Sequence, residues 1–359
     1  MKNDILEKFI GYQTISTVDV MKKIDKNAIC LLYIVDDNNR LVGCLTDGDI
    51  RRWIIKTGNL TGTASQMMNP SPRFLYEKDA EKCQDLMNRE KIYSVPIVDA
   101  SKRIIDIKVK NGWKPFDIGD HNSSLSDTPI IIMAGGKGTR LYPYTKVLPK
   151  PLIPIREVPI LERIFDRFYH FGVKKFYLTV NYKKEMIKSY FSDINPPYAI
   201  QYIEEENPAG TAGSICLIRE KFTKPVLIAN CDSLIEADYG KIVRHHRESG
   251  NDMTIISSVK NAVIPYGVLH SKEDGIVTRM EEKPQFSYII NTGMYIVNPE
   301  FLDWIPENRV FHMTDLADIM LQEGKKVGMY PVSENSFLDM GEFEEMKKME
   351  ERIQGSNTE

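Results

Sequence analysis

The residues best suited to chemistry lie in one run, Gly135-Gly136-Lys137-Gly138-Thr139-Arg140, which follows the apolar segment Ile130–Met133 and Ala134. Three glycines in four positions allow the backbone to turn sharply and to bring its N–H groups close to a ligand, because no Cβ stands in the way. Oriented N–H groups bind anions, and Lys137 and Arg140 add full positive charge. The spacing fits neither a Walker loop nor a dinucleotide-binding fingerprint. The run therefore predicts a phosphate-binding loop of another kind.

Two further residues have the character of a site for a polyanion. Lys150 stands between Pro149 and Pro151, which restrict the backbone and so pre-position its ammonium group. Asp232 follows the apolar run Val226–Ala229, and a carboxylate at the end of a buried strand is costly unless it binds something. A surface lysine in a proline-rich loop, and a helix cap or salt bridge for Asp232, are the alternatives.

The elements that must position these residues follow an alternating pattern. From Thr128 onward, we expect strands over residues 130–133, 176–180, 198–203 and 226–229, separated by helices over residues 160–168, 186–190 and 212–219. This alternation predicts a doubly wound α/β sheet with right-handed crossovers. Ligands of such sheets bind beyond the carboxyl ends of the strands, where the glycine loop, Asn181 and Asp232 emerge. We therefore expect one shared site.

The N-terminal part of the chain contains an internal repeat. Val20–Asp36 aligns with Cys83–Asp99, and each unit is expected to contain a short helix, a strand, a turn that begins with Asp, and a second strand. In the first unit, Thr46 or Asp47 can then cap a further helix. A repeat of two units shares one core, so neither half should be stable alone.

The expected domain organisation follows from these patterns. We place the repeats at about residues 14–60 and 77–108 of an N-terminal domain over residues 1–108. Residues 109–127 are rich in Gly, Asn, Ser and Asp and lack periodicity, which is typical of a linker. Residues 128–359 form the second domain.

Composition excludes several classes of function. The 359 residues include 47 Lys and Arg and 50 Asp and Glu, so no overall basic charge suggests nucleic acid binding. The chain contains no apolar run of about 18 residues and no N-terminal signal segment, so we expect no membrane association. The five cysteines lack metal-binding spacing, and we expect buried thiols in a reducing cytoplasm.

The string AGGKGTRL, followed by LPKPLIPI, resembles the sugar-1-phosphate nucleotidyltransferase family. The resemblance implies a Rossmann-like doubly wound mixed sheet. It also implies the reaction of an NTP with a sugar 1-phosphate to give an NDP-sugar and pyrophosphate, by in-line attack at the α-phosphorus. Such a reaction brings two polyanions together, so it needs cations, a metal and rigid positioning. Mg²⁺ is the implied cofactor, with Mn²⁺ as a substitute.

The resemblance also assigns roles to residues of the glycine loop and beyond. The expected nucleotide-binding residues of the loop are Ala134, Gly135, Gly136, Lys137, Gly138 and Thr139. Arg140 is expected to steady the leaving pyrophosphate, and Lys150 to contact the phosphates at the reacting centre. Asp232 is expected to bind the metal together with Asp339, although the family's W-x-D-x-G string has its aromatic residue displaced here.

Shorter motifs resemble the family's base and sugar contacts. The segment around Gly210, Thr211 and Ala212 resembles L-G-T-A-G, which lies along the edge of the base, and Thr211 can also cap the helix expected after it. Expected contacts to the sugar phosphate come from the Y-G-V, E-K-P and N-x-G strings, at Tyr266, Gly267, Glu282, Lys283, Asn291 and Gly293. Each string alone could be an ordinary turn, but the order and spacing of the three strings together argue against that interpretation.

The repeat resembles a tandem pair of CBS domains, a Bateman module, notably in LVGCLTDGDIRR. In that family the Thr and Asp of G-x-x-T-x-x-D hold the ribose of an adenine nucleotide, and here Thr46 and Asp49 match. The second repeat has Ile104–Lys108 at this place, which argues against a second nucleotide site. A pair that binds nothing and mainly dimerises is the alternative. Such modules usually self-associate, so we expect a homodimer.

The arrangement of CBS repeats before a transferase resembles guanylyltransferases that activate glucosamine 1-phosphate for nonulosonic (legionaminic-type) acid synthesis, which favours GTP. Uridylyl-, thymidylyl- and cytidylyltransferases remain alternatives, because base choice rests on few contacts. A catalytically silent nucleotide sensor would lack residues such as Arg140 and Lys150, which are present. A phosphocholine transferase would not need the strings that contact sugar hydroxyls. The histidines, His312 included, stand away from the motifs and are expected to be solvated or in the core.

Overall fold

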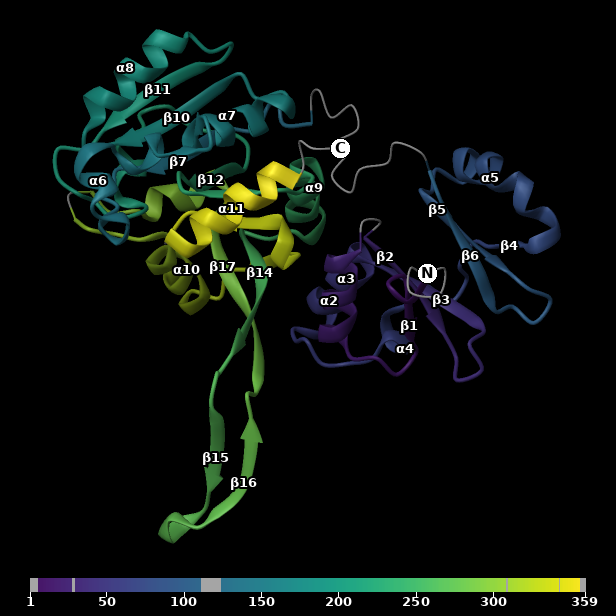
Figure 1. Cartoon of the computed structure of the whole chain (residues 1–359). Helices are drawn as coiled ribbons and strands as arrows, with labels where there is room; N and C mark the ends of the chain where they lie inside the picture. The colour runs from purple at the N-terminus through teal and green to yellow at the C-terminus, as the bar shows by residue number, and fades with distance from the viewer. Residues whose placement is uncertain (1–5, 28–29, 111–123, 308, 342, 356–359) are drawn as a thin grey trace. The chain divides into compact units, whose positions relative to one another are not determined.

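The computed structural model describes residues 6–27, 30–110, 124–307, 309–341 and 343–355 (Figure 1). It divides into two compact units, which are described separately below. The first comprises the described residues of Met1–Asp117, Val259–Ile290 and Ser333–Asn335, and the second those of Ile118–Ser258, Asn291–Val332 and Ser336–Glu359. Most of the linker expected over residues 109–127 lies outside the described residues.

The first unit contains two small sheets, each of three strands, in the described residues before 111 (Figure 1). The elements of the first repeat are β1 (Ile10–Tyr12), α2 (Thr17–Lys26), β2 (Leu31–Val35), β3 (Leu41–Thr46), α3 (Asp47–Thr57) and α4 (Ala64–Met67). Those of the second are β4 (Leu75–Tyr76), η1 (Glu77–Lys82), α5 (Cys83–Glu90), β5 (Ser94–Val98) and β6 (Ile104–Val109).

The two sheets repeat each other closely, as the alignment of the two sequence segments predicts. In each sheet the first pair of strands is parallel and the second pair is antiparallel. The register shifts between Ile34 and Val35 in one sheet and between the aligned Ile97 and Val98 in the other. The hydroxyl groups of Tyr33 and Ser94 lie 2.6 Å apart, and Tyr33, Leu41 and Val98 share one buried cluster. The repeats therefore share a core, as predicted.

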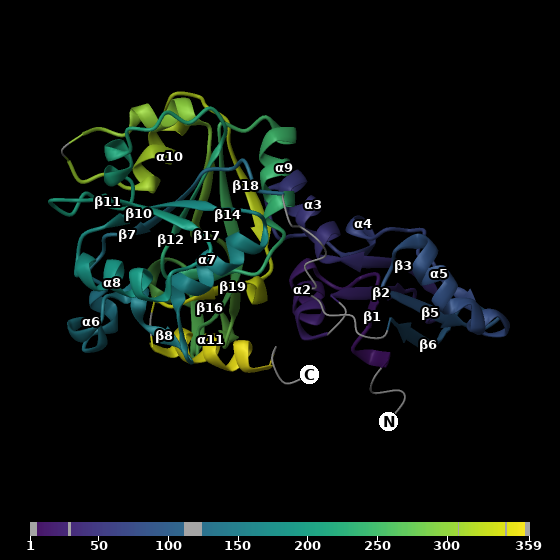
Figure 2. The same cartoon turned by 90° about the horizontal axis from the view of Figure 1, so that it is seen from above.

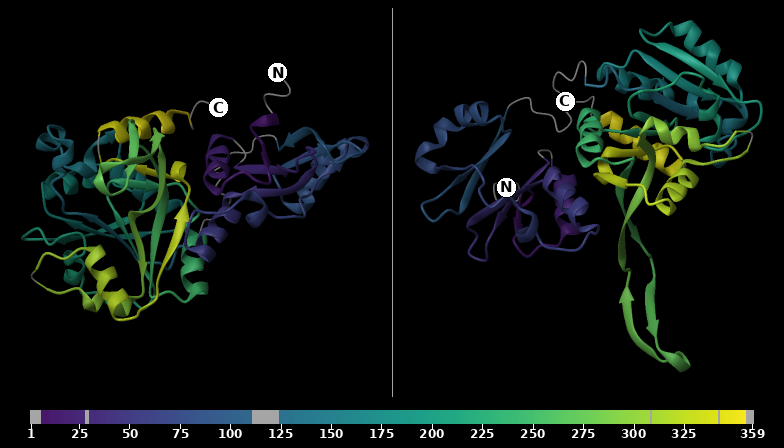
Figure 3. Two further views of the ribbon diagram at one scale, coloured as in Figure 1. Left: turned by 90° about the horizontal axis from the view of Figure 1, so that it is seen from below. Right: turned by 180° about the vertical axis from the view of Figure 1, so that it is seen from behind.

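The remainder of the first unit is a hairpin inserted from the later sequence. Strands β15 (Gly267–Ser271) and β16 (Val277–Glu282) pair as a two-stranded antiparallel ribbon, joined through η5 (Glu273–Gly275) (Figure 3). The long strand β14 (Met253–Val263) ends in this insertion, and β17 (Gln285–Val297) begins in it. The rest of each strand belongs to the second unit.

The second unit is built on a mixed sheet of seven strands in the described part of the chain, in the order β11-β10-β7-β12-β17-β14-β18 (Figure 2). Its strands, besides β14 and β17, are β7 (Ile130–Ala134), β10 (Lys175–Val180), β11 (Ala199–Glu204), β12 (Val226–Asn230) and β18 (Val327–Val332). The strands β11, β10, β7 and β12 run parallel, and β17 pairs antiparallel with β12. The mixed doubly wound sheet expected from the sequence is confirmed.

Helices cover both faces of this sheet (Figure 2). One face packs against α7 (Ile160–His170), α8 (Lys184–Ile194), α9 (Tyr239–Ser249) and α11 (Phe343–Gly355). The other packs against α10 (Met313–Gln322) and the short 3₁₀ segments η4 (Gly213–Leu217) and η6 (Pro299–Trp304). The strand β7 is buried on both faces, since Ile130 and Ile132 face one cluster and Ile131 the other.

Short elements complete the second unit around the strand ends. They are η2 (Thr139–Leu141), α6 (Tyr144–Val147), η3 (Lys150–Leu152), the strand pair β8 (Pro154–Ile155) and β9 (Val158–Pro159), the pair β13 (Ser233–Ile235) and β19 (Phe337–Asp339), and η7 (Glu334–Ser336), which spans the unit boundary. The α-helix expected over residues 212–219 is instead the short 3₁₀ segment η4, where the Ile215 amide donates to the Ala212 carbonyl oxygen three residues earlier (2.9 Å). No helix among the described residues has the length and apolarity needed to span a membrane.

Candidate functional site

The site forms where the four parallel strands of the second unit end. Val180 in β10 pairs with both Ala134 of β7 and Glu204 of β11, and Asn230 of β12 pairs with Met133. The residues that follow these strands therefore emerge along one edge of the sheet, as expected for this topology. The glycine loop and Asp232 meet there, as predicted. Asn181 has another role, because its side chain donates a hydrogen bond of 2.9 Å to the carbonyl oxygen of Glu205.

A cavity of about 390 Å³ opens at this edge. It is lined by the glycine loop, by Lys150 and Asp232, and by the segment that resembles the base-edge motif. The lining residues are Met133, Gly135, Gly136, Gly138, Thr139, Arg140, Lys150, Thr179, Glu205, Pro208, Ala209, Gly210, Thr211, Asn230, Cys231, Asp232 and His312. Seven of the residues expected from the sequence in the loop and at the reacting centre thus line one cavity, namely Gly135, Gly136, Gly138, Thr139, Arg140, Lys150 and Asp232.

The glycine loop reaches this cavity through a left-handed turn at Gly138. Its φ of +64° is costly for a residue with a Cβ, and a Cβ would also lie 2.9 Å from Thr145 Cγ2 and 3.0 Å from Lys150 Cβ. The Thr145 hydroxyl donates a hydrogen bond of 2.9 Å to the Gly138 carbonyl oxygen. Gly138 therefore allows the loop to pack directly on the segment that carries Lys150.

The cation and the acid expected at the reacting centre form an ion pair. Lys150 Nζ lies 2.5 Å from Asp232 Oδ2, and the two side chains are 9% and 17% exposed. Lysine is seldom buried unless it is paired, so this position is maintained by the carboxylate. An incoming phosphate group would offer Lys150 a second anion at the same place.

Asp339 lies beside Asp232 because β13 and β19 pair antiparallel. Ser233 is opposite Asp339, and the Met340 amide donates a hydrogen bond of 2.8 Å to the Asp232 carbonyl oxygen. Burial, and then the negative charge of Asp232, raise the pKa of the Asp339 carboxyl, while Lys150 and Arg140 oppose this change. The carboxyl groups of Asp232 and Asp339 therefore share a confined space, and the positive charges of Lys150 and Arg140 only partly offset their mutual repulsion.

A second cavity, of about 320 Å³, adjoins the first. Both cavities are lined by Arg140, Thr211, Asn230, Asp232 and His312. The second adds Ser233, Asn291, Thr292, Gly293, Tyr295, Thr314, Phe337 and Asp339. Asn291 is held in place because its Nδ2 donates to the Tyr295 hydroxyl (2.6 Å) and its Oδ1 accepts from the Gly293 amide (2.9 Å). Two ligands could therefore meet at Asp232, one in each cavity.

The structure corrects two expectations at the shared wall of the cavities. Thr211 does not cap the segment after it, because the N-cap residue of η4 is Ala212, which offers no side-chain hydrogen bond. Its hydroxyl instead accepts a hydrogen bond of 3.1 Å from the amide of Met313, at the start of α10. His312, expected to stand away from the motifs, lines both cavities, and its Nδ1 accepts a hydrogen bond of 3.2 Å from the Thr211 amide. The chain returns to this wall from a distant segment, which the order of the motifs does not reveal.

Some expected site residues lie elsewhere. Ala134 and Ala212 are buried in the two core clusters and do not line the cavity, and Lys137 is exposed. The Y-G-V and E-K-P strings belong to the hairpin of the first unit, where Gly267 pairs with Glu282 and the Lys283 amide donates to the Tyr266 carbonyl oxygen (3.3 Å). Strand pairing thus brings these two strings together, as their proposed common role requires.

The first unit has a cavity of its own, of about 570 Å³, between the two repeats. It is lined by residues of both, including Thr46, Asp49, Arg52, Arg73 and Lys91. The Thr46 side chain accepts from the Asp49 amide and the Asp49 carboxylate accepts from the Thr46 amide (2.9 Å), which forms a capping box at the start of α3. The Thr46 hydroxyl also donates a hydrogen bond of 2.6 Å to Asp49 Oδ2. The helix cap expected at Thr46 is confirmed.

Comparisons with known proteins agree with this geometry. The family model described as "Nucleotidyl transferase" matches residues 130–355, and that for the CBS domain matches residues 12–56. The chain belongs to the nucleotidyl transferase family. The nucleotidyl transferase match includes the strand ends that form the site, and the CBS match covers most of the first repeat.

Individual members of the family differ in the base that they use. A UTP–glucose-1-phosphate uridylyltransferase from Synechocystis is 34% identical, over 51% of this chain and 52% of that protein. A mannose-1-phosphate guanyltransferase beta-B from Xenopus laevis is 32% identical, over 54% of this chain and 56% of that protein. The chain thus spans about half the length of these relatives. The crystal structure of HddC from Yersinia pseudotuberculosis is 27% identical, covers 63% of this chain and 99% of its own, and has a TM-score of 0.50.

Among the cavity residues of this nucleotidyl transferase that sequence reasoning missed, Glu205 is the acidic one. It follows directly after β11, at the same edge as Asp232, and it is 5% exposed. It lies in the run Glu204-Glu205-Glu206, and successive acids are usually solvated. The signal that could have revealed it is its place directly after the strand predicted over residues 198–203, at the carboxyl edge where such sheets bind ligands.

Proposed function

We propose that the protein is a sugar-1-phosphate guanylyltransferase, which joins GTP and a hexose or hexosamine 1-phosphate to give a GDP-sugar and pyrophosphate. The observation that carries the proposal is the pair of adjoining cavities that share Asp232 and Arg140, with Lys150 paired to Asp232. The nucleotide would occupy the cavity of the glycine loop, and the sugar phosphate the cavity of Asn291. The α-phosphorus would then lie at their junction.

The reaction needs positioning and positive charge. An oxygen of the sugar 1-phosphate forms a bond to the α-phosphorus, while the bond from that phosphorus to the oxygen bridging the β-phosphorus breaks and its electron pair leaves with pyrophosphate. The attacking oxygen is already anionic, so no general base is required. Lys150 would hold the phosphates close together, and Arg140 would stabilise the charge on the leaving pyrophosphate.

The pair of Asp232 and Asp339 suits a divalent cation. Burial and the charge of Asp232 both raise the pKa of the Asp339 carboxyl, so a second positive charge there would relieve unfavourable electrostatics. No further His, Cys, Asp or Glu completes a group of three among the described residues, which leaves ligand positions for phosphate oxygens. Mg²⁺, or Mn²⁺, held by Asp232 and Asp339 would neutralise the phosphate oxygens at the junction.

Residues around the second cavity fit a sugar phosphate. The side chain of Asn291 is oriented by Tyr295 and Gly293, so it presents a fixed amide to sugar hydroxyls. For Glu282 and Lys283, which strand pairing in the hairpin of the first unit brings near Gly267 and Tyr266, the family resemblance gives the roles of binding sugar hydroxyls and the sugar phosphate. The guanylyltransferases that activate glucosamine 1-phosphate suggest a role in surface-glycan or nonulosonic acid synthesis.

The test is pyrophosphate release with Mg²⁺, in which ATP, GTP, CTP, UTP and dTTP are crossed with the 1-phosphates of glucosamine, N-acetylglucosamine, mannose and glucose. Selective release with GTP and one sugar supports the proposal. Release with UTP, dTTP or CTP would keep the enzyme class and reject the guanylyl assignment. No release with any pair would favour a silent nucleotide sensor.

For the cavity between the repeats we propose an adenine nucleotide as ligand, with Thr46 and Asp49 at its ribose. The cavity brings Arg52, Arg73 and Lys91 to the same space, and these cations suit phosphates. Calorimetry with AMP and ATP tests the proposal, with Asp49→Asn as the variant that should weaken binding. We also propose that the module makes the chain a homodimer, and a monomer in light scattering at micromolar concentration would reject this.

A further inference from the structure

The short helix α6 ends just before Lys150, and its last carbonyl groups lack the usual helical partners. Pro149 stands four residues after Thr145, so the Thr145 carbonyl oxygen lacks the N–H group that would continue the helix. The same holds for Val147 and Pro151. The two prolines that pre-position Lys150 thus leave the end of α6 in need of donors from elsewhere in the fold.

Side chains of the turn between β10 and α8 supply these donors. The Tyr182 hydroxyl donates a hydrogen bond of 3.0 Å to the Thr145 carbonyl oxygen. The Lys183 ammonium donates to the carbonyl oxygens of Lys146 and Val147, at 2.6 and 2.7 Å. A cation at the C-terminal end of a helix also offsets the negative partial charge of the carbonyl groups there. Two neighbouring side chains therefore hold the last three carbonyl oxygens of α6.

The backbone of Lys183 is strained where it makes these contacts. Its φ of +52° and ψ of +36° lie in the left-handed region, which favours glycine. The Lys183 ammonium also lies 5.5 Å from the centre of the Tyr182 ring, so the two side chains support each other. A strained backbone that directs a cation onto two carbonyl oxygens indicates a specific role for that cation.

The support of α6 reaches both cations of the nucleotide cavity. Thr145 is fully buried, and its hydroxyl donates a hydrogen bond of 2.9 Å to the Gly138 carbonyl oxygen, two residues before Arg140. In the other direction, two residues separate α6 from Lys150, and one of them is Pro149, which restricts the backbone. A displacement of α6 would therefore move Lys150 relative to the glycine loop.

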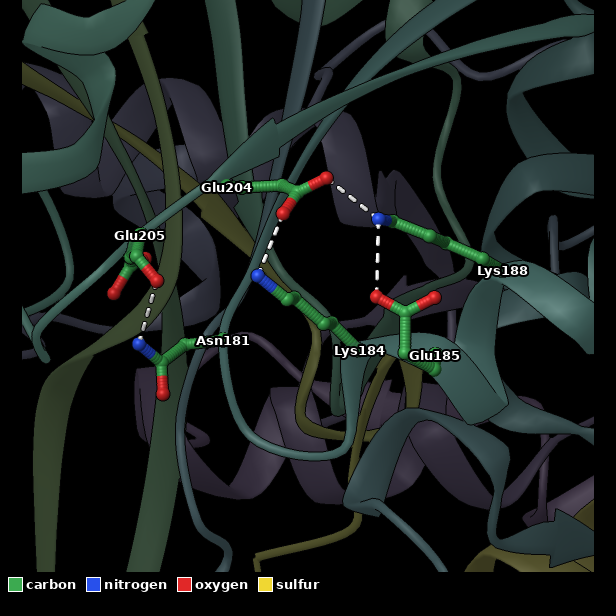
Figure 4. A network of polar contacts seen from close by, with 6 residues as sticks. All are labelled: Asn181, Lys184, Glu185, Lys188, Glu204 and Glu205. Carbon is green, nitrogen blue, oxygen red and sulfur yellow. Dashed lines mark hydrogen bonds and ion pairs between the residues drawn. The ribbon is translucent and has the colours of Figure 1, made fainter.

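The polar residues on either side of this pair are directed away from α6 (Figure 4). Asn181 points toward Glu205 and donates a hydrogen bond of 2.9 Å to its carbonyl oxygen. Lys184, the first residue of α8, points toward Glu204, at 2.6 Å. Within the described ranges, neither side chain forms a hydrogen bond with α6. Lys184 therefore carries the same charge as its neighbour without the same contacts.

We propose that Lys183, together with Tyr182, is a positioning residue for the transfer step, which holds Lys150 at the place where the phosphates of the two substrates react. This inference rests on the proposed function. Lys183 lines neither cavity of the site, so it acts through α6. Its loss should affect the chemical step, because a small misplacement of a group at a reacting centre can lower the rate about 100-fold.

The experiment measures kcat and the KM for the nucleotide by pyrophosphate release, with Mg²⁺ and the substrate pair that supports turnover. Lys183→Met keeps the length of the side chain and removes its donors, so kcat should fall about 10- to 100-fold. The KM for the nucleotide should change less than about 3-fold, because no residue that lines the cavity is altered. Lys183→Arg keeps a cation with several donors and should retain most of the parent's kcat.

Two further variants make the test specific. Tyr182→Phe removes only the hydrogen bond to Thr145, so kcat should fall about 3- to 10-fold, and this variant still decides the question if Lys183→Met fails to fold. The matched control is Lys184→Met, which removes the same charge at the adjacent residue and should keep the parent's kcat and KM. Thermal melts establish that each variant is folded at the assay temperature.

The outcomes separate this inference from the proposed function. A folded Lys183→Met variant with the parent's kcat, or with a raised KM alone, overturns the role of Lys183 and leaves the transferase intact. An equal fall of kcat in Lys184→Met, or a folded Lys183→Arg variant as slow as Lys183→Met, also overturns it. If Lys183→Met does not fold, parent-like turnover by Tyr182→Phe has the same consequence. Absence of turnover by the parent with every substrate pair removes the proposed function, and this inference with it.

Discussion

Lys150 and Asp232 form an ion pair at the junction of two cavities, although they come from separate segments of the chain. Lys150 begins η3, within a proline-rich loop, and Asp232 follows the central strand β12. Because both side chains are largely withdrawn from solvent, each holds the other in position. The pair is therefore both a structural element and a candidate for the reacting centre, and variants of it should separate the two roles.

Asp232→Asn should abolish turnover and leave the fold intact. The amide keeps the volume of the side chain but removes its charge, so the proposed metal and the orientation of Lys150 are both lost. We expect kcat to fall by roughly 100-fold or more, measured as pyrophosphate release with the best substrate pair. Circular dichroism should match that of the parent. Turnover like that of the parent would show that the metal assignment is wrong.

Lys150→Met should lower both activity and stability, because it leaves the Asp232 carboxylate without its cation. The cavity admits water, so we expect a loss of about 1–3 kcal/mol in the free energy of unfolding by urea, below the cost for a fully buried pair. The double variant Lys150→Met/Asp232→Asn should regain most of that stability and remain inactive. If the double variant is the least stable, the pair is not coupled.

Gly138→Ala should destabilise the protein more than an alanine at another left-handed glycine. The matched control is Gly250→Ala, at the end of α9, where φ is +58° and no atom lies within 4 Å of the added Cβ. That control carries only the conformational cost, of about 1–2 kcal/mol. At Gly138 the Cβ also contacts Thr145 and Lys150, so urea unfolding should show a larger loss, and kcat should fall as well. Equal losses would mean that the loop adjusts freely.

His246 should make the fold sensitive to mild acid. It is buried between Thr254 (2.9 Å from Nδ1) and Asn298 (3.0 Å from Nε2), and burial is the main cause that lowers its pKa below the usual value. The folded state thus favours the neutral ring. The neutral His246 ring contributes fully to the free energy of unfolding above the ordinary histidine pKa, near 6.5. This contribution is lost as the pH falls through that value and toward the lower pKa of the folded state.

Thermal melts from pH 7.5 to 5 test this sensitivity. The parent's Tm should fall with acidification more steeply than that of His246→Gln, which cannot gain the proton. His270→Gln, at an exposed histidine, is the control and should follow the parent. A His246→Gln profile parallel to that of the parent would contradict the role of His246.

Local sequence patterns predicted much of this architecture because they act over short distances. The apolar run of β7 marks a strand buried on both faces, and the repeated Asp-led turns place Asp36 and Asp99 where each accepts backbone hydrogen bonds from residues two and four positions later. The capping box of Thr46 and Asp49 is likewise local. By contrast, the sequence predicts that Thr211 caps a helix after it. The Thr211 hydroxyl instead accepts a hydrogen bond from the amide of Met313, and no local pattern specifies this contact.

The sequence by itself therefore determined the class of the site: a glycine loop with cations, a lysine between prolines and an acid at a strand end, in the order typical of the nucleotidyl transferase family. Only the tertiary structure decided which side chains complete that site. His312 reaches the cavity wall because α10 begins there, and Glu205 because β11 lies beside β10 in the sheet. The physical reason is that strand order and helix placement bring distant residues to one edge, whereas motifs record only neighbours along the chain.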